Sequence, residues 1–464
     1  MKKRKFSMPH VYTLLVALII IAGIMTYLVP AGTFDRVELN GRSAVVPGTF
    51  HYIEQTPVSI FEWFKAIPEG FISSADILVG IFIFVAAIGV YMDSGVFHKA
   101  IFKLLKVFGQ KGELVVMVIL MAFFAALGGF TGNITPEMAF VPMTIAFCQA
   151  VGFDVMTGVI MVIFPTFVGF ATGPINPYTV YVAQQVAELP PFSGMGMRAV
   201  MWTASCLISF WFVIRYARKT RKNPELSLSG FGEAAEVSDD LEQYRHAPFT
   251  GRDVVLLILF VITILWLVLG TVTWDYSFND FTAVFIISGI LGGIVAGFTE
   301  TRIAEIFIKY GGGIYFGAMC LALARAVFVV ISKGNITDTI VYAMSLPLQN
   351  LTGAASAVGM FIFQTFLNFF INSGSGQAMV SMPIMAPLSD LLHVTRQTAV
   401  SAFQFGDGLS NLIWPTSSTI FAYLAFGNLK YDKYLKLAVP LFGLLSLLGA
   451  AFLIVAQLTN YGPF

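Results

Sequence analysis

Polar side chains gather in two short stretches of a chain that is otherwise strongly apolar. One stretch, "INSGSGQAMVSMP" (371–383), lies between the apolar runs "FIFQTFLNFF" and "IMAPLSDLL", and the other is "TGNITPE" (131–137). Hydroxyl and amide oxygens can bind a cation such as sodium, and the free N–H groups at the start of a helix can bind a carboxylate. The candidate substrate-binding residues in the two stretches are Thr131, Gly132, Asn133, Glu137, Asn372, Ser373, Gly374, Ser375, Gly376 and Gln377.

Three ionisable residues lie in apolar surroundings, where an unpaired charge is costly and a functional role is the default hypothesis. Arg325, in "CLALARAVFVVI", can bind the carboxylate of a substrate or form a structural ion pair. Glu137 is either a carboxylate stabilised by a helix N-terminus or a site for a substrate ammonium, a proton or a coupling cation. Asp407 has three open interpretations: a partner of Arg325, a cation ligand, or a partner for unwound backbone.

The composition identifies the class of protein. Of the 464 residues, 57% are hydrophobic and 11% are charged, whereas soluble proteins are about 25% charged. We therefore expect a polytopic membrane protein in a lipid bilayer. A net charge of +1 gives no reason to expect a nucleic-acid partner, and the Cys and His residues show no metal-ligand spacing. No nucleotide-binding or hydrolase motif is present, so we expect neither an enzyme nor a cofactor-dependent protein.

Basic loops predict the orientation in the membrane. The segments "MKKRK", "HKAIFKLLKVFGQKGE" and "RYARKTRKNPE" are rich in Lys and Arg, and the positive-inside rule places them in the cytoplasm. We expect a multi-pass protein of the cell (inner) membrane with a cytoplasmic N-terminus. The polar segment 217–252, which is acidic from 225 to 249 and contains Gly and Ser, is predicted to be a flexible cytoplasmic linker between two halves, 1–216 and 253–464.

Four segments are long and apolar but are interrupted by Gly, Pro and polar residues. Residues 113–151 and 352–393 each place two apolar arms around one polar stretch, which predicts re-entrant hairpins. Residues 157–186 and 398–425 predict transmembrane helices that are broken at "TGPINP" and "GDGLSNLIWPTSS". The breaks add the candidate substrate-binding residues Asn176, Asn411, Thr416 and Ser417. The candidate ligands for a coupling sodium ion are Asn133, Ser410, Asn411 and Thr416.

A weak internal repeat relates the two halves. An alignment of 130–143 with 371–384 and of 167–179 with 405–417 places Met138, Pro142 and Pro177 on Met379, Pro383 and Pro415. The second half has one extra span, so the two copies are expected to enter the membrane from opposite sides. This arrangement is the inverted-topology repeat of secondary transporters, in which broken helices form the binding site near the midplane. The predicted fold is an all-α polytopic membrane protein with two re-entrant hairpins and two broken transmembrane helices.

Three segments carry a resemblance to a known family. The segments "SGSGQAMVSMPIMAPLSDLL", "TRQTAVSAFQFGDGLSNLIWPTSS" and "KYDKYLKLAVPL" resemble the YfcC branch of the anaerobic four-carbon dicarboxylate carrier (DcuC) family. The resemblance implies a member of the ion-transporter superfamily, a homodimer whose mobile transport domains move by an elevator mechanism. It also implies dicarboxylates or, for this branch, basic amino acids as substrates. The branch has two Glu residues at the first tip, whereas this chain has only Glu137 there.

These observations predict a secondary active transporter of a small carboxylate-bearing metabolite. An amino acid offers a carboxylate to Arg325 and an ammonium to Glu137, whereas a dianion would be repelled by Glu137 and Asp407 unless these are protonated or cation-bound. We therefore expect an amino acid, with a basic one moved by exchange. The alternative is a four-carbon dicarboxylate carrier coupled to sodium or protons. A channel is a minor alternative, because neither hairpin has an NPA-type signature.

Overall fold

The computed structural model describes residues 10–39, 42–108, 112–132, 134–230, 244, 247–274, 276–312 and 315–462. Within these ranges, eight helices are long and apolar enough to cross a membrane. They are α1 (Val11–Leu28), α3 (Ala75–Asp93), α5 (Gly112–Thr131), α7 (Val155–Thr172), α9 (Met195–Lys222), α12 (Phe278–Ala296), α14 (Tyr315–Lys333) and α20 (Tyr431–Leu458). The chain is therefore a helical, multi-pass membrane protein, as its composition predicts.

The remaining helices complete the fold. They are α2 (Ile60–Ile72), α4 (Val96–Phe108), α6 (Val141–Ala150), α8 (Val180–Val186), α11 (Gly251–Thr273), α13 (Glu300–Gly312), α15 (Thr337–Ser345), α16 (Ala354–Phe370), α17 (Gly374–Leu391), α18 (Arg396–Ser410) and α19 (Ser418–Phe426), with 3₁₀ helices at Pro136–Phe140, Pro224–Leu226 and Leu346–Asn350. Polar N-caps fix several helix starts. Asp154 accepts from the Thr157 N–H at 2.9 Å before α7, and Thr250 forms a capping box before α11.

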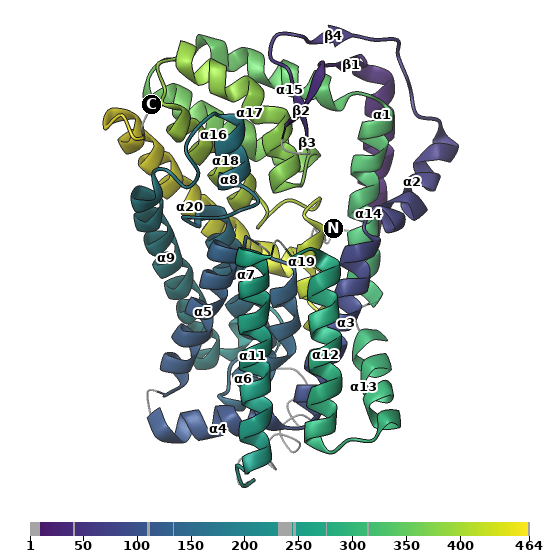
Figure 1. Ribbon diagram of the computed structural model, residues 1–464, viewed down its shortest axis with the longest axis vertical. Helices are drawn as coiled ribbons and strands as arrows, with labels where there is room; N and C mark the ends of the chain where they lie inside the picture. The colour runs from purple at the N-terminus through teal and green to yellow at the C-terminus, as the bar shows by residue number, and fades with distance from the viewer. Residues whose placement is uncertain are drawn as a thin grey trace, which may run out of the picture.

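A short β segment is the one part of the described chain that departs from an all-helical fold. Strands β1 (Gly32–Thr33) and β4 (His51–Tyr52) pair antiparallel, and so do β2 (Arg36–Leu39) and β3 (Arg42–Val45). We call residues 32–52 the strap. Figure 1 shows the strap at one end of the molecule, over α15 and α17. Arg36 fixes it there through two bonds to Asp338 of α15, at 2.9 and 3.0 Å.

Helix breaks lie inside all four segments in which the sequence predicts interruptions. Helix α5 ends at Thr131 and α6 begins at Val141, and α7 and α8 are separated by residues 173–179. In the second half, residues 371–373 separate α16 from α17, and residues 411–417 separate α18 from α19. Three of these breaks contain Gly or Pro, whereas residues 371–373 contain neither, and there the N-cap Ser373 marks the start of α17. Entry of the two hairpins from opposite membrane faces, and the division into 1–216 and 253–464, stay predictions.

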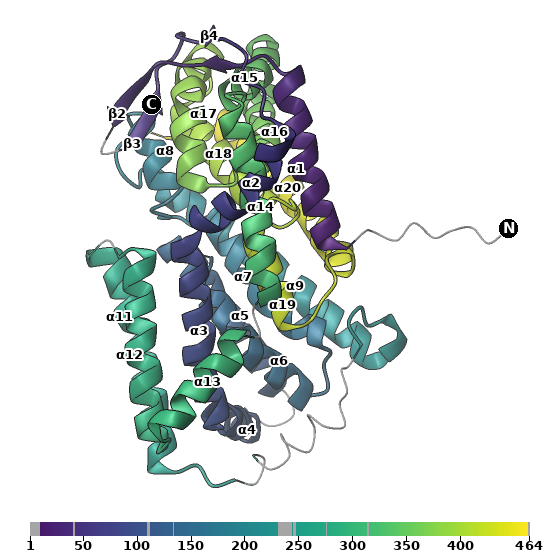
Figure 2. The same cartoon turned by 90° about the vertical axis from the view of Figure 1, so that its right-hand side faces the viewer.

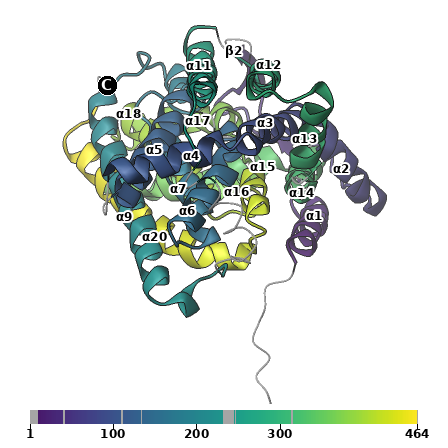
Figure 3. The same cartoon turned by 90° about the horizontal axis from the view of Figure 1, so that it is seen from below.

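Each hairpin packs closely on the broken helix of its own half. Helix α5 lies along α7, and α16 lies along α18. Glycines make this approach close: a Cβ added to Gly406 of α18 would lie 2.8 Å from the Phe361 carbonyl oxygen of α16. A separate group of helices, α3, α11, α12 and α13, lies together on one side of the molecule (Figure 2). Figure 3 shows α9 and α20 away from this group, beside the hairpins.

The end of the segment predicted as a flexible linker (217–252) contacts α4. Residues 217–222 continue α9, and residues 231–243, 245 and 246 lie outside the described chain. The Tyr244 ring stacks on the ring of His98 at 5.0 Å between centroids and at 11°. Lys103 Nζ lies 4.3 Å from the centre of the Phe249 ring. The described C-terminal end of this segment is therefore held against α4.

Candidate functional site

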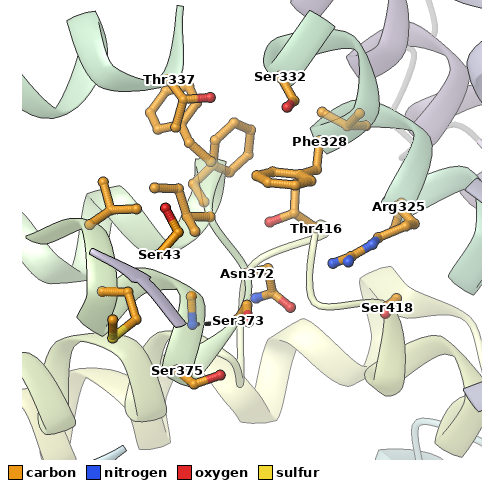
Figure 4. Close-up of a pocket in the computed structure, with 18 of the residues that line it drawn as sticks. Ser43, Arg325, Phe328, Ser332, Thr337, Asn372, Ser373, Ser375, Thr416 and Ser418 are labelled. Atoms are coloured by element: carbon orange, nitrogen blue, oxygen red, sulfur yellow. Dashed lines mark hydrogen bonds between the residues drawn. The ribbon is translucent and has the colours of Figure 1, made fainter. Parts of the chain in front are cut away.

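Two adjoining cavities lie where the second hairpin tip meets α14. Their volumes are about 560 Å³ and about 280 Å³. Both are lined by Arg325, Asn372, Ser373, Ser375 and Ser418, so they are compartments of one site. We call the larger one the strap cavity, because Arg36 and Ser43 of the strap line it (Figure 4). The smaller one is the tip cavity, because residues of both hairpin tips line it.

The second tip presents the start of α17 to both cavities. Ser373 is the N-cap of α17, and its Oγ accepts a hydrogen bond from the Gly376 N–H at 3.3 Å. Gly374 lines the tip cavity, and Gly376 and Ser375 line the strap cavity. The free N–H groups and the positive end of the α17 dipole therefore lie at the site, which favours a bound anion.

Arg325 supplies a positive charge that forms no ion pair with any described residue. It projects from α14 toward the tip residue Asn372 and toward Ser418 (Figure 4). Among the described residues, its guanidinium has no ion pair and no hydrogen bond, although it lies 5.3 Å from the centre of the Phe328 ring. The structural ion pair that the sequence leaves open is thus not formed within the described chain. An unpaired guanidinium beside a helix N-terminus is well suited to bind a carboxylate.

The first tip reaches the tip cavity from the opposite half of the chain. Gly132, Ile134 and Thr135 line this cavity, and Gly132 has a φ of 66°, which glycine adopts without strain. The predicted ligand Asn133 lies outside the described residues. Thr131 is buried, and its hydroxyl bonds to the backbone of α5 rather than lining either cavity.

Asn176 holds the first break together. Its Nδ2 donates to the Phe170 carbonyl at 3.0 Å, and its Oδ1 accepts from the N–H groups of Tyr178 and Thr179 at 2.9 and 3.2 Å. The structure thus places Asn176 behind the cavity wall, where it holds the turn that precedes α8. Tyr178 is the residue of this break that lines the tip cavity.

An amide network joins the second break to the second tip. Asn368 of α16 donates through Nδ2 to the Ser410 Oγ at 2.8 Å and to the Asn411 Oδ1 at 3.0 Å. Asn372 donates to the same Asn411 oxygen at 2.7 Å. Asn411 lines the tip cavity, whereas Ser410 is buried behind it. The sodium-ligand candidates Ser410 and Asn411 are therefore neighbours, and their oxygens already accept hydrogen bonds.

The other predicted site residues of this half differ in where they point. Thr416 lines the strap cavity, and its buried hydroxyl has no partner in the described chain. Ser417 is buried and lines neither cavity. Gln377 also lies away from both: it is buried between the hairpin arms, where its amide donates to Gln364 at 2.8 Å.

The two carboxylates that the sequence predicts at the site lie behind the cavity walls. Glu137 and Asp407 are 3% and 0% exposed, and neither lines a cavity. Both oxygens of Asp407, and Oε2 of Glu137, lack a hydrogen-bond partner among the described residues. No described Asp or Glu lines either cavity, and no described cluster of three His, Cys, Asp or Glu side chains could hold a metal. The walls of the site thus carry positive and neutral groups only.

Sequence reasoning did not select Asn368 or Phe328. Ser418 belongs to the polar run that the sequence places at the second break, and it lines both cavities, whereas its neighbour Ser417 lines neither. Asn368 lies inside the apolar arm "FLNFF", four residues before Asn372, and that helical spacing was the available signal. Phe328 is three residues from Arg325 and has no distinguishing sequence pattern.

Comparisons with known proteins place the chain among transporters. The family model described as C4-dicarboxylate anaerobic carrier, DcuC, matches residues 8–458. The "Putative basic amino acid antiporter YfcC" of Escherichia coli K12 is 30% identical over 500 residues, covering 99% of this chain and 98% of its own. An uncharacterized protein of Haemophilus influenzae is 27% identical, with 98% of each chain covered.

Two solved transporter structures also align along the chain. MtrF of Neisseria gonorrhoeae, from a class of antimetabolite efflux pumps, gives a TM-score of 0.47 at 16% identity and covers 98% of this chain and 97% of its own. The YdaH transporter of Alcanivorax borkumensis gives a TM-score of 0.44 at 14% identity and covers 98% of this chain and 100% of its own.

Proposed function

Because the chain belongs to the C4-dicarboxylate anaerobic carrier family, we propose that it is a secondary active transporter of a small carboxylate-bearing metabolite. The observation that carries this proposal is the unpaired Arg325 at the point where both hairpin tips meet. The carboxylate binds between the Arg325 guanidinium and the first N–H groups of α17. No charged group has to move away first, because the described chain gives Arg325 no ion-pair partner.

An amino acid is the substrate class that the tip cavity fits best. Three helix ends lie at this cavity. Gly374 at the N-terminus of α17 lines it, and so do Gly132 and Asn411, which directly follow the C-terminal ends of α5 and α18. The negative ends of two helix dipoles therefore face the positive end of a third. A zwitterion matches both signs, with its ammonium at the carbonyl ends and its carboxylate at Arg325. The name of the relative YfcC suggests a basic amino acid moved by exchange.

A four-carbon dicarboxylate is the second candidate. The absence of any described acidic side chain from the cavity walls favours it, because a dianion meets no like charge there. Glu137 and Asp407, which the sequence predicts to repel a dianion, lie behind the walls. The family description names this substrate class.

Asp407 is the group that we propose for ion coupling. Its carboxylate is fully buried, has no hydrogen-bond donor in the described chain, and approaches the start of α17: a Cβ at Gly374 would lie 3.4 Å from Oδ2. A buried carboxylate of this kind takes up a proton or a sodium ion, because either removes the cost of an unpaired charge. Coupling then follows, since the same tip binds the substrate on its other side.

The wider mechanism follows the transporter class. We propose two inverted repeats, whose hairpins and broken helices move together as transport domains of a homodimer. The N-terminus and the basic loop before α5 lie in the cytoplasm of a cell (inner) membrane, by the positive-inside rule. The close packing of each hairpin on its own broken helix supports movement as one body.

Proteoliposomes test the proposal. Vesicles are loaded with lysine or arginine, or with succinate or fumarate, and uptake of the labelled compound is followed with and without sodium and proton gradients. Saturable uptake that an internal counter-substrate accelerates supports exchange of that class, and uptake driven by an ion gradient supports the coupled alternative. Uptake that neither saturates nor responds to any gradient would reject a secondary transporter.

A further inference from the structure

Each broken helix is held by the long helix that follows it. Helices α9 and α20 are both 28 residues long. Arg198, the fourth residue of α9, donates through Nε and Nη2 to the Pro174 carbonyl at 3.1 and 3.0 Å. Tyr434, the fourth residue of α20, donates through its hydroxyl to the Leu412 carbonyl at 3.1 Å. Pro174 and Leu412 lie in the first and second breaks.

These two contacts occupy equivalent places. The alignment of 167–179 with 405–417 pairs Pro174 with Leu412, although that alignment uses no information from α9 or α20. In each half, a side chain one turn into the following helix therefore bonds to the same carbonyl of the break. Unwound carbonyls in a membrane protein need such donors, because hydrocarbon offers none. We call Arg198 and Tyr434 the two clamps.

The two clamps differ in charge. Arg198 is 0% exposed, and its remaining donors reach neutral oxygens, the Phe192 carbonyl and the Tyr461 hydroxyl, both at 3.4 Å. No described carboxylate pairs with it. It lies at the carbonyl end of α7, where a cation is favoured. Tyr434 is neutral, and the second break has a second neutral donor in Tyr431. Burying a cation is costly, and the neutral Tyr434 shows that an uncharged donor can hold a break. The charge of Arg198 therefore needs an explanation beyond hydrogen bonding.

We propose that Arg198 is a positioning residue that holds the first break in the substrate-binding conformation and adds positive charge behind the tip cavity. Its hydrogen bonds fix Pro174, four residues before Tyr178, which lines that cavity. Gln404 of α18 fixes the preceding carbonyl, that of Gly173, at 2.8 Å. The effect on affinity rests on the proposed function, whereas the effect on the backbone does not.

Hydrogen exchange tests the clamp without any substrate. Arg198→Gln keeps a donor but removes the charge, and Tyr434→Phe is the matched change at the second break. We expect Arg198→Gln to raise deuterium uptake in peptides covering 173–182 and to leave 411–420 unchanged, with the reverse result for Tyr434→Phe. If folded Arg198→Gln shows wild-type deuterium uptake at 173–182, or the same increase at 173–182 and at 411–420, the role of Arg198 as a clamp is overturned.

Binding measurements test the role of the charge. In detergent-purified protein, Arg198→Lys should keep the Kd for lysine or succinate near that of the wild type, whereas Arg198→Gln should weaken it about 10-fold, as expected for losing a charged hydrogen-bond donor. A merely structural role would lower the melting temperature of both variants and leave the Kd of the folded fraction unchanged, and that result would overturn the proposal. If the wild type binds no amino acid or dicarboxylate, the proposed function fails, and the exchange experiment still decides the clamp.

Discussion

Replacing Arg325 by Gln should separate binding from stability. Removing an Arg from a buried ion pair destabilises a protein, because the partner charge is left buried and unpaired. Arg325 differs, because the described chain gives it neither an ion pair nor a hydrogen bond. An unpaired, partly buried cation costs free energy in the absence of substrate. We therefore expect Arg325→Gln to fold as well as the wild type, or better, and yet to bind substrate poorly.

The size of the binding defect follows from the lost contact. A hydrogen bond to a charged group contributes about 1.5–3 kcal/mol. At about 1.4 kcal/mol per factor of ten, Arg325→Gln should weaken the Kd roughly 10- to 100-fold. The variant also loses the cation–π contact with Phe328, which costs about 0.5–1 kcal/mol of stability and offsets part of the stability gained by removing the unpaired charge.

Thermal unfolding and calorimetric titration measure the two quantities in the same preparation. Arg302→Gln is the matched control: Arg302 forms an ion pair with Asp93 at 2.6 Å, is 48% exposed, and lines neither cavity. We expect this control to lower the melting temperature only slightly, because exposed ion pairs are screened by solvent, and to keep the wild-type Kd. A lower melting temperature for Arg325→Gln together with an unchanged Kd would refute the reasoning, because Arg325 would then act in the fold and not at the site.

Further predictions concern coupling, packing and pH. Asp407→Asn should remove the dependence of uptake on the sodium or proton gradient while counter-substrate exchange continues, and uptake that still follows the gradient contradicts the coupling role. Gly406→Val should destabilise the protein by about 1–3 kcal/mol through overpacking against the Phe361 carbonyl, measured as a lower melting temperature, with Gly443→Val of α20 as the control because its Cβ position is open. Burial lowers the pKa of His98 to about 4, below its ordinary value of about 6.5, so the folded protein binds fewer protons than the unfolded chain and loses stability as the pH falls through this range. Between about pH 7 and pH 5 the loss should reach roughly 2 kcal/mol, seen as a lower melting temperature, and His98→Phe should remove this part of the pH dependence.

The sequence predicted the helix interruptions because their cause is local. Gly or Pro lies in three of the four breaks, although Pro165 and Pro383 stand inside α7 and α17, and a polar centre between apolar arms is visible in the sequence. The predicted hairpin 352–393 contains α16 and α17 with the break at 371–373, and the predicted broken helix 398–425 contains α18 and α19. The membrane class and the family followed equally from composition and motifs.

The direction of each polar side chain could not be predicted in this way. Ser375 lines both cavities, whereas Gln377, two residues later on the same helix, is buried against Gln364. The difference depends on how α17 is rotated against α16, which many distant contacts determine. The same reason hid Arg198, whose position near the start of α9 looks like an ordinary basic flank until Pro174 is seen beside it.

The glycine contacts between hairpin and broken helix restrict how the site can open. In the first half, Gly128 of α5 lies against the backbone of Thr166 in α7, and in the second half Gly406 lies against Phe361. If α5 slid along α7, or α16 along α18, by one residue, a larger side chain would replace Gly128 or Gly406 and clash with the facing carbonyl. The paired helices therefore keep a fixed register. Disulfide cross-links placed across these seams should therefore be tolerated without loss of turnover. We expect any movement of the tips to occur at Gly132, whose φ is 66°, and at residues 371–373, where no helix fixes the backbone.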